Sequence, residues 1–170
     1  MQRDGSPLFH VVLHEPCIPN NTGNIGRTCL AMGAALHLIE PLGFDLGEKA
    51  VRRAGLDYWP RLSPSVYPDW SSYLRRHPGA RRWFFEPRLG RPHFAAEFGV
   101  GDHLVFGKET GSLPESVIAG QVDRLVSIPL CSGERSLNLA TAVCVGLAEG
   151  VRQLAFDGRV DLSGGIELST

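Results

Sequence analysis

Side chains suited to chemistry gather in three short stretches of the chain, each directly after an apolar run. In the first, NTGNIGRT at 21–28, amides, hydroxyls and glycines surround a single cation, Arg27. The free N–H groups of a helix start attract anions, so this stretch predicts either an anion-binding helix start or a well-capped helix with a surface arginine. The helix is predicted to begin near Asn24, with its cap supplied from residues 20–22.

The second stretch, VFGKETGSLPES at 105–116, has the glycine and lysine of a phosphate-binding loop but not its spacing. Five residues separate Gly101 from Gly107, whereas a phosphate loop has four. Glu109 stands where a serine or threonine would bind magnesium, and its carboxylate would repel a triphosphate. The pattern GxGxxG is absent as well. These features exclude an ordinary nucleotide-binding loop.

The third stretch, IPLCSGERSLNLATAV at 128–143, leads into a long helix predicted over 137–154. Apolar residues recur there at steps of three and four positions, which is typical of a helix with one buried face. Ser136 and Asn138 stand at the start of this helix, where asparagine is a favourable N-cap. Asn138 is therefore either a helix cap or part of a polar site.

Strands and helices that alternate along the chain must position these stretches. Apolar, β-branched or aromatic runs predict strands, and segments with helical spacing lie between them. This alternation is typical of an α/β fold with a mostly parallel sheet flanked by helices. The predicted strands cover 8–14, 35–40, 81–86, 102–107 and 124–130, and the predicted helices cover 24–33, 45–54, 69–77, a short turn after Pro114, and 137–154.

Three of the predicted strands end in the dipeptide Glu-Pro, at 15–16, 40–41 and 86–87. Proline cannot donate a hydrogen bond to a neighbouring strand, so it ends each strand cleanly. In open α/β sheets, ligands bind beyond the carboxyl ends of the strands. We therefore expect the functional site at this edge of the sheet.

The composition limits the class of protein. The chain has 170 residues, of which 43% are hydrophobic and 21% charged, as expected for one globular domain; we expect this domain over 1–156 and a loosely ordered tail over 157–170. No apolar run approaches the ~20 residues of a membrane span, and the N-terminus lacks the apolar core of a signal peptide. A cytoplasmic protein without a membrane partner is the prediction.

The cysteine spacing and the net charge of the sequence give little indication of a metal site or of nucleic-acid binding. The four cysteines show no CxxC spacing, and His10 and His14 share one face of a strand, so we expect reduced thiols, structural histidines and no metal. The net charge of −1 is low for a dedicated nucleic-acid binder. Any contact with phosphates must therefore come from local arginine clusters, such as those within 75–91.

Taken in order, the three stretches resemble the signature motifs of the SpoU-type branch of the SPOUT methyltransferases. The phrases HEPCIPNNTGNIGRTC, LHLIEPLGF and RRAGLDYW are similar to the short members of that branch that methylate the ribose of the tRNA wobble nucleotide. The resemblance covers the chain from about Leu8 to Leu154. It departs from the family in the second motif, where Gly111 and Ser112 replace a basic residue and a glycine.

The resemblance implies a fold, a cofactor and a set of site residues. The fold would be an α/β knot, with a deep trefoil knot near the C-terminus that holds S-adenosyl-L-methionine in a bent form. The product would be S-adenosyl-L-homocysteine. The implied cofactor-binding residues are Glu86, Gly107, Ile128, Leu130, Ser136 and Leu137.

The resemblance also implies catalytic residues, namely Arg27, Glu109, Ser136 and Asn138. Because a guanidinium stays protonated in proteins, we expect Arg27 to polarise the ribose 2′-hydroxyl or its adjacent phosphate rather than to act as a simple base. Glu109 is expected to hold Arg27 through a bidentate pair. The substrate would be a tRNA anticodon stem-loop with cytidine or a modified uridine at the wobble position.

The resemblance further implies a homodimer. On the helix predicted over 137–154, Ala140, Cys144 and Ala148 form a line of small residues that would allow close approach of a second copy; burial within one chain is the alternative. Two other functions remain open at this stage, a knotted RNA-binding protein without catalysis and a flavodoxin-like ligand-binding domain. The pair of Arg27 and Glu109 argues against the flavodoxin-like domain. The presence of Arg27, Glu109, Ser136 and Asn138 together argues against an RNA-binding protein without catalysis.

Overall fold

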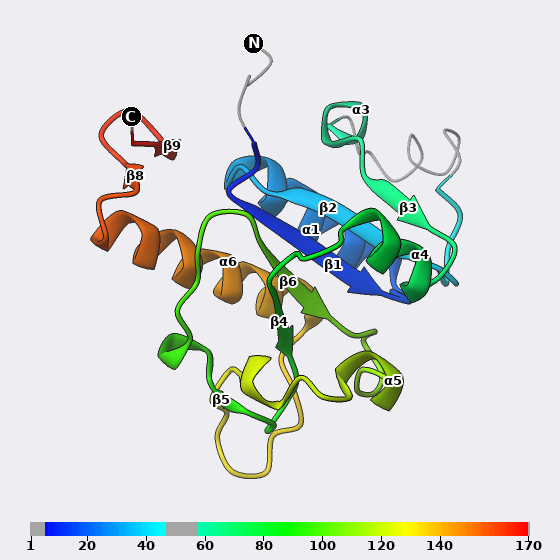
Figure 1. Ribbon diagram of the computed structural model, residues 1–170. Coiled ribbons are helices and arrows are strands. Elements are labelled where there is room, and N and C mark those ends of the chain that lie inside the picture. The colour runs from blue at the N-terminus through cyan, green and yellow to red at the C-terminus, as the bar shows by residue number, and fades with distance from the viewer. Residues whose placement is uncertain (1–5, 47–57, 170) are drawn as a thin grey trace.

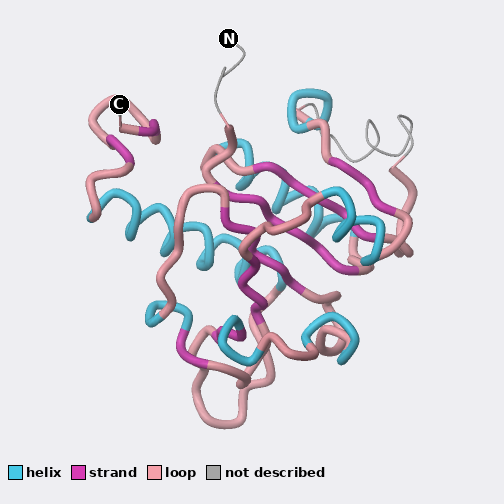
Figure 2. The backbone as a smooth tube through the Cα atoms, viewed as in Figure 1, coloured by secondary structure: helices cyan, strands magenta, loops and turns pink. Residues whose placement is uncertain are grey.

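The computed structural model describes residues 6–46 and 58–169. These residues form an α/β fold in which helices cover both faces of one sheet (Figure 1, Figure 2). The helix predicted over 45–54 lies, apart from its first two residues, outside the described part of the chain.

The main sheet in the described residues has seven strands, and all of its paired neighbours are parallel. Their order across the sheet is β3-β2-β1-β6-β4-β7-β5. A short antiparallel pair, β8 and β9, follows the last helix. The strands are β1 Phe9–His14, β2 Ala35–Ile39, β3 Ser65–Tyr67, β4 Arg82–Phe85, β5 Arg91–Pro92, β6 Asp102–Phe106, β7 Leu125–Ser127, β8 Val160–Asp161 and β9 Glu167–Leu168.

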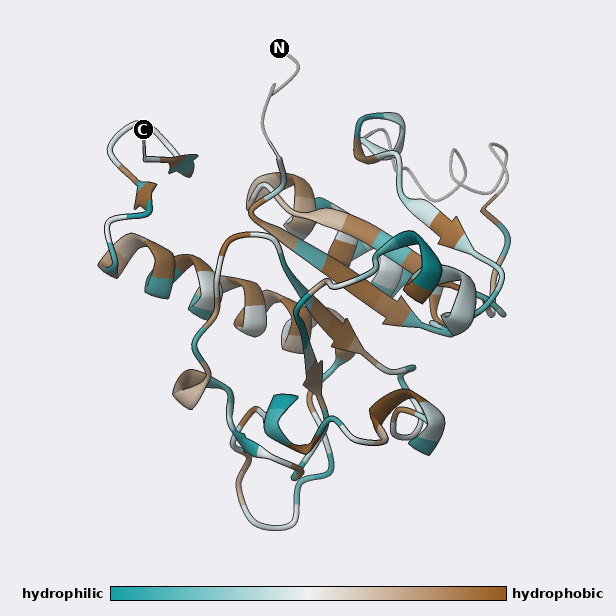
Figure 3. Ribbon diagram, in the orientation of Figure 1, coloured by the Kyte–Doolittle hydropathy of each residue, from teal (hydrophilic) through white to brown (hydrophobic). Residues whose placement is uncertain are grey.

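Alternate side chains of each central strand enter two separate cores, which explains the apolar runs of the sequence. On one face, Val11 and Leu13 of β1 pack with the helices α1 and α6. On the other face, Val12 packs with α4 and α5. Figure 3 shows the central strands as predominantly hydrophobic. The helices are α1 Pro19–Ala31, α3 Trp59–Leu62, α4 Trp70–Arg76, α5 Glu115–Ile118 and α6 Leu139–Phe156, with 3₁₀ turns at His93–Ala95 and Val122–Arg124.

The helix α6 is long and apolar enough to cross a bilayer by length and composition alone. Five of its apolar side chains, spaced three or four positions apart, belong instead to the core that it shares with α1 and the sheet. The helix α6 is therefore a core helix of the α/β fold.

Two predictions about the elements are wrong. The helix α1 begins at Pro19, five residues before the predicted start near Asn24, so residues 20–22 lie within its first turn and do not cap it. Proline is well suited to that first turn because its missing N–H has no partner there anyway. The strand predicted over 124–130 ends at Ser127, and the short edge strands β3 and β5 were not predicted.

The Glu-Pro dipeptides do end β1, β2 and β4, as predicted. Because β1, β6 and β4 are adjacent in the sheet, the segments that follow them leave the same edge side by side. The first two chemical stretches, at 21–28 and 105–116, are brought together in this way.

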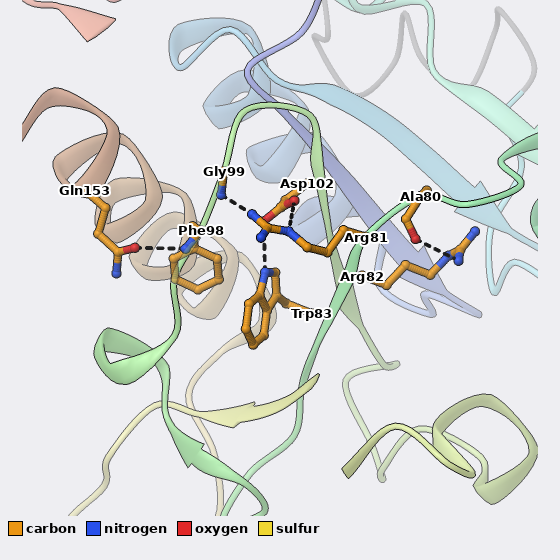
Figure 4. Close-up of polar contacts among 8 residues, drawn as sticks. All are labelled: Ala80, Arg81, Arg82, Trp83, Phe98, Gly99, Asp102 and Gln153. Atoms are coloured by element: carbon orange, nitrogen blue, oxygen red, sulfur yellow. Dashed lines mark hydrogen bonds and ion pairs between the residues drawn. The ribbon is translucent and has the colours of Figure 1, made fainter. Parts of the chain in front are cut away.

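At the opposite edge of the sheet, the buried carboxylate of Asp102 joins three segments (Figure 4). It accepts two hydrogen bonds from the Arg81 guanidinium, at 2.6 and 2.8 Å. It also accepts from the Trp83 indole and from the Gly99 N–H, both at 2.9 Å. Asp102 therefore fixes the starts of β4 and β6 relative to each other, at the opposite end of the strands from the Glu-Pro dipeptides.

Replacing Asp102 by alanine should lower the free energy of unfolding by about 2–4 kcal/mol, because the Trp83 and Gly99 donors would lose their partner in a buried place. Urea denaturation followed by circular dichroism measures this change. Asp123→Ala, at an exposed position, is the matched control and should stay within about 0.5 kcal/mol of the wild type. Equal stability of the Asp102 variant and the control would contradict the structural role.

Candidate functional site

A cavity of about 540 Å³ opens beyond the carboxyl ends of the central strands β4, β6 and β7. Its walls come from the segments after these strands and from the start of α6. The cavity lining includes every residue predicted to bind the cofactor, namely Glu86, Gly107, Ile128, Leu130, Ser136 and Leu137.

The lining of this cavity has an apolar part and a positively charged part. Phe85, Phe106 and Ile128, with other aliphatic residues, give an apolar surface, whereas Lys108 and Arg135 bring positive charge. A ligand with a flat apolar part and an anionic group matches both. S-adenosylmethionine, with its adenine ring and its carboxylate, is such a ligand.

Glu86 gives the cavity wall an unused hydrogen-bond acceptor. The residue is 2% exposed, and its Oε1 accepts a hydrogen bond of 2.6 Å from the Leu113 N–H, while Oε2 has no partner. Burial raises the pKa of this carboxyl, although the Leu113 N–H and the Ser112 hydroxyl act in the opposite direction. An unsatisfied buried acceptor is costly, so a ligand with hydroxyl or amino donors fits this wall.

Glu109, from the second stretch, binds the start of α1. Its Oε2 accepts from the Cys17 N–H at 2.8 Å, and its Oε1 accepts from the Ile18 N–H at 3.0 Å and from the Asn21 amide at 3.1 Å. Burial alone would raise the pKa of Glu109, but these hydrogen bonds outweigh burial and lower the pKa. The ionised carboxylate therefore caps a helix whose own N-cap, Ile18, offers no side-chain acceptor.

Asn21 and Asn138 extend this connection to the third stretch. The Asn138 amide donates a hydrogen bond of 2.9 Å to Asn21 Oδ1, and Asn138 Oδ1 accepts from the Ala140 and Thr141 N–H groups. Asn138 is thus the N-cap of α6 and a member of the polar site at the same time. The hydrogen bonds from Glu109 through Asn21 to Asn138 join all three stretches. Asn21 of the first stretch and Glu109 of the second are 88 residues apart in the sequence.

Arg27 lies apart from this chain of contacts. Its side chain is exposed on α1, and its guanidinium carbon lies 5.2 Å from the centre of the Tyr58 ring. The predicted bidentate pair between Arg27 and Glu109 is not formed, because Glu109 binds the start of α1 instead. The prediction failed because α1 begins earlier than expected, which brings its first N–H groups to Glu109.

One residue of the polar site was not predicted as such. Asn21 was expected only as a possible helix cap, but it is the link between Glu109 and Asn138. Its amide has both a donor and an acceptor, so it can bridge a carboxylate and another amide. Its place in the same short stretch as Arg27 was the available signal.

The parallel α/β fold, the cavity beyond its strands and the three joined stretches define a SpoU-type methylase. The family model described as "SpoU rRNA Methylase family" matches residues 8–148, and the chain belongs to this family.

Proteins similar to this chain include methyltransferases that are named for tRNA. The tRNA (cytidine(34)-2'-O)-methyltransferase of Saccharophagus degradans is 42% identical over 152 residues, which are 89% of this chain and 99% of that protein. A solved structure described as "Structural insights into the 2-OH methylation of C/U34 on tRNA" is 43% identical, with a TM-score of 0.81, and the match covers 89% of this chain and 99% of the other.

A third similar protein was solved with its cofactor. The SpoU methyltransferase AviRb from Streptomyces viridochromogenes, in complex with AdoMet, is 25% identical with a TM-score of 0.74. The match covers 89% of this chain and 60% of that chain. The match to AviRb therefore includes nearly all of the fold described above.

Proposed function

We propose that this protein transfers the methyl group of S-adenosylmethionine to the ribose 2′-hydroxyl of nucleotide 34 of tRNA, the wobble position, where it accepts cytidine or a modified uridine. The observation that carries this proposal is that Glu109, which lines the cavity, joins the three stretches through its hydrogen bond with Asn21 and the hydrogen bond between Asn21 and Asn138. The relatives that match the chain over most of its length, and whose names state this reaction, support the choice of substrate.

S-adenosylmethionine supplies an electrophilic methyl group on a sulfonium, so the protein needs only to position the nucleophile and to manage its proton. Glu86, Gly107 and the segment 128–137 hold the cofactor in the cavity. Ser136 and Asn138 line the side on which the ribose enters. Glu109 fixes the loop 107–112 against the start of α1, so that the cavity keeps its shape.

Arg27 acts on the ribose. Its guanidinium donates hydrogen bonds to the 2′-hydroxyl or to the adjacent phosphate and stabilises the negative charge that develops on the oxygen. The free edges of the guanidinium suit this role, because no ion pair described in the structure involves Arg27.

The remaining parts of the proposal concern fold and location. The chain segment after β7 forms the deep trefoil knot of the family, within one catalytic domain over 1–156. Residues 157–170 follow this domain as a tail, and its strand β8 packs back onto the main core through Val160. The protein works in the cytoplasm, where its tRNA substrate is found, and uses no metal ion.

Nucleoside analysis tests the reaction. An unmodified anticodon stem-loop, the purified protein and S-adenosylmethionine should give 2′-O-methylated nucleoside at position 34, detected by mass spectrometry after digestion. The matched control is the same RNA with a 2′-deoxynucleotide at position 34, which should accept no methyl group. Methylation at another position would contradict the substrate assignment, and RNA binding without transfer would favour the non-catalytic alternative.

We also propose that the protein acts as a homodimer through α6. Ala140 and Cys144 are half-buried and Ala148 is exposed in the single chain, so this line of small residues is available for a second copy. Pairing would add the arginine clusters of two chains, which gives a nearly neutral protein enough positive surface for an anticodon stem-loop.

Light scattering should give a particle of twice the 18.5 kDa chain mass. Ala148→Arg should shift it toward the monomer and weaken tRNA binding, whereas Ala119→Arg, at an exposed position on the other face of the sheet, should change neither. A fully active wild-type monomer would contradict the shared site. The affinity for tRNA should also fall steeply as salt rises, because phosphate contacts release counterions.

A further inference from the structure

The segment that begins α3 packs directly against the part of α1 that carries Arg27. Tyr58 is 5% exposed, and its hydroxyl donates a hydrogen bond of 2.5 Å to the Gly23 carbonyl of α1. Its ring lies beneath the Arg27 guanidinium, at 5.2 Å from ring centre to guanidinium carbon. Tyr58 is thus anchored to α1 four residues before Arg27 and contacts Arg27 itself.

Gly26 allows this close approach of the two helices. A Cβ atom at position 26 would lie 2.6 Å from Leu62 Cδ2, 3.3 Å from Trp59 Cζ3 and 3.5 Å from Tyr58 Cε2. A larger residue would displace the Leu62 side chain and crowd the ring of Trp59, which follows Tyr58 in the sequence. The small residue just before the arginine therefore has a definite steric purpose.

An aromatic face restrains an arginine in a different way from a carboxylate. A carboxylate binds the N–H groups of the guanidinium, whereas an aromatic ring attracts the cation through its flat face and leaves the N–H edges free. Arg27 needs those N–H groups for the substrate if it acts on the ribose. The contact with Tyr58 is therefore suited to an arginine that must be held in place and still be able to donate.

We infer that Tyr58 is a positioning residue for Arg27, holding the guanidinium over its ring so that the N–H edges face the ribose or phosphate of the bound RNA. This inference rests on the proposed function, because it assigns a purpose to Arg27 only in methyl transfer. Tyr58 itself does not contact the reacting atoms.

Two variants separate the ring from the hydroxyl. Tyr58→Phe keeps the ring and should retain kcat within about threefold, with a small loss of thermal stability from the lost bond to Gly23. Tyr58→Leu removes the ring and should lower kcat by about 3- to 30-fold, the range expected for one cation–π contact. The KM for tRNA and the Kd for S-adenosylmethionine, measured by calorimetry, should change by less than about twofold in both.

A double-mutant cycle distinguishes positioning from general support of the fold. In an Arg27→Lys background the planar cation is already absent, so Tyr58→Leu should cause little further loss of kcat. The matched control is Trp59→Leu, which removes another aromatic ring from the same helix contact but not the ring beneath Arg27. Its effect should be the same with and without Arg27→Lys.

The outcomes are distinct. A wild-type protein that does not methylate nucleotide 34 overturns the proposed function, and with it the inference. If the wild-type protein does methylate nucleotide 34, and Tyr58→Leu lowers kcat by the same factor in both backgrounds, the inference alone is overturned. A Tyr58→Phe variant as inactive as Tyr58→Leu also overturns it, because the ring would then not be the important part.

Discussion

Methyl transfer should fall by about 10²–10³-fold or more when Arg27 is replaced by alanine, because a donor that stabilises the developing negative charge would be lost. The affinity for S-adenosylmethionine should hardly change, since Arg27 is not among the residues that line the cavity proposed for the cofactor. Stability should also hold, because Arg27 is exposed and the ion pairs of the described residues do not involve it.

Arg27→Lys should fail nearly as badly. Lysine keeps the charge, but its ammonium is a compact point charge that cannot present the planar, multiple N–H donors of a guanidinium. Single-turnover methyl transfer and calorimetric titration with the cofactor measure the two effects separately. Arg61→Ala, an exposed arginine on the neighbouring helix α3, is the matched control. Parallel losses of turnover and cofactor affinity in Arg27→Ala would mean that Arg27 supports the cavity instead.

The second large effect should appear when the pH is lowered from 7 to 5, where we expect the free energy of unfolding to fall steeply. His37 and His103 are buried, with exposures of 4% and 3%. Burial, together with the neighbouring His10 and His77, lowers the pKa of His37 to about 3 and the pKa of His103 to about 2. Arg82 contributes to the shift of His103 as well.

The direction of the effect follows from proton binding. In the unfolded chain these two histidines take up protons below pH 6.5, whereas in the folded chain they stay neutral down to much lower pH. Stability is therefore fully present above pH 6.5 and is lost as the pH falls below it. For each extra proton that the unfolded chain binds, the free energy of unfolding falls by about 1.4 kcal/mol per pH unit. The two histidines together should therefore lower the free energy of unfolding by roughly 4 kcal/mol at pH 5.

The contacts of the cluster support a neutral state. His10 Nδ1 lies 2.8 Å from His37 Nε2, and His37 Nδ1 lies 3.0 Å from the Tyr67 hydroxyl. The Tyr73 hydroxyl lies 2.6 Å from His103 Nδ1. Although the ring nitrogens of His10, His37 and His103 lie within 4.8 Å of one another, the rings of His10 and His103 are stacked in parallel, so their lone pairs do not converge on a common point.

Urea titrations at pH 7, 6 and 5 measure how steeply the free energy of unfolding falls with pH. His103→Phe should reduce this slope by the amount that corresponds to one bound proton, because one of the two buried histidines is removed. The pKa of Glu109 is also lowered, but a carboxylate loses its contribution below its unfolded value of about 4.5, outside this window. A flat stability profile between pH 6.5 and 5 would contradict the neutral buried cluster.

The strand positions were predictable because each buried strand is an apolar run closed by a strong stop signal. The runs around Val11, Leu38 and Val105 lie at the centre of β1, β2 and β6, and Glu-Pro marks several of the strand ends. The edge strands β3 and β5 have three and two residues. Segments this short contain no period that sequence alone can show.

The start of α1 was mispredicted for a different reason. Asparagine and threonine at 20–22 favour helix caps, so local propensity placed the start after them. The actual cap is the carboxylate of Glu109, which is 91 positions from Ile18 in the sequence. Interactions over such separations are invisible to local patterns. The same distant contact explains why the pair of Arg27 and Glu109 was predicted wrongly.

The distant cap of α1 also has a consequence for biosynthesis. The segment that forms β1 and α1 leaves the ribosome before Glu109 has been translated. Until then the first N–H groups of α1 lack their partner, and β1 lacks β6, its neighbour toward the middle of the sheet. Pairing of such distant segments is slow, because a long loop must close first. The first stretch of the nascent chain therefore lacks the cap of its helix, and the three stretches can come together only after β6 has docked beside β1.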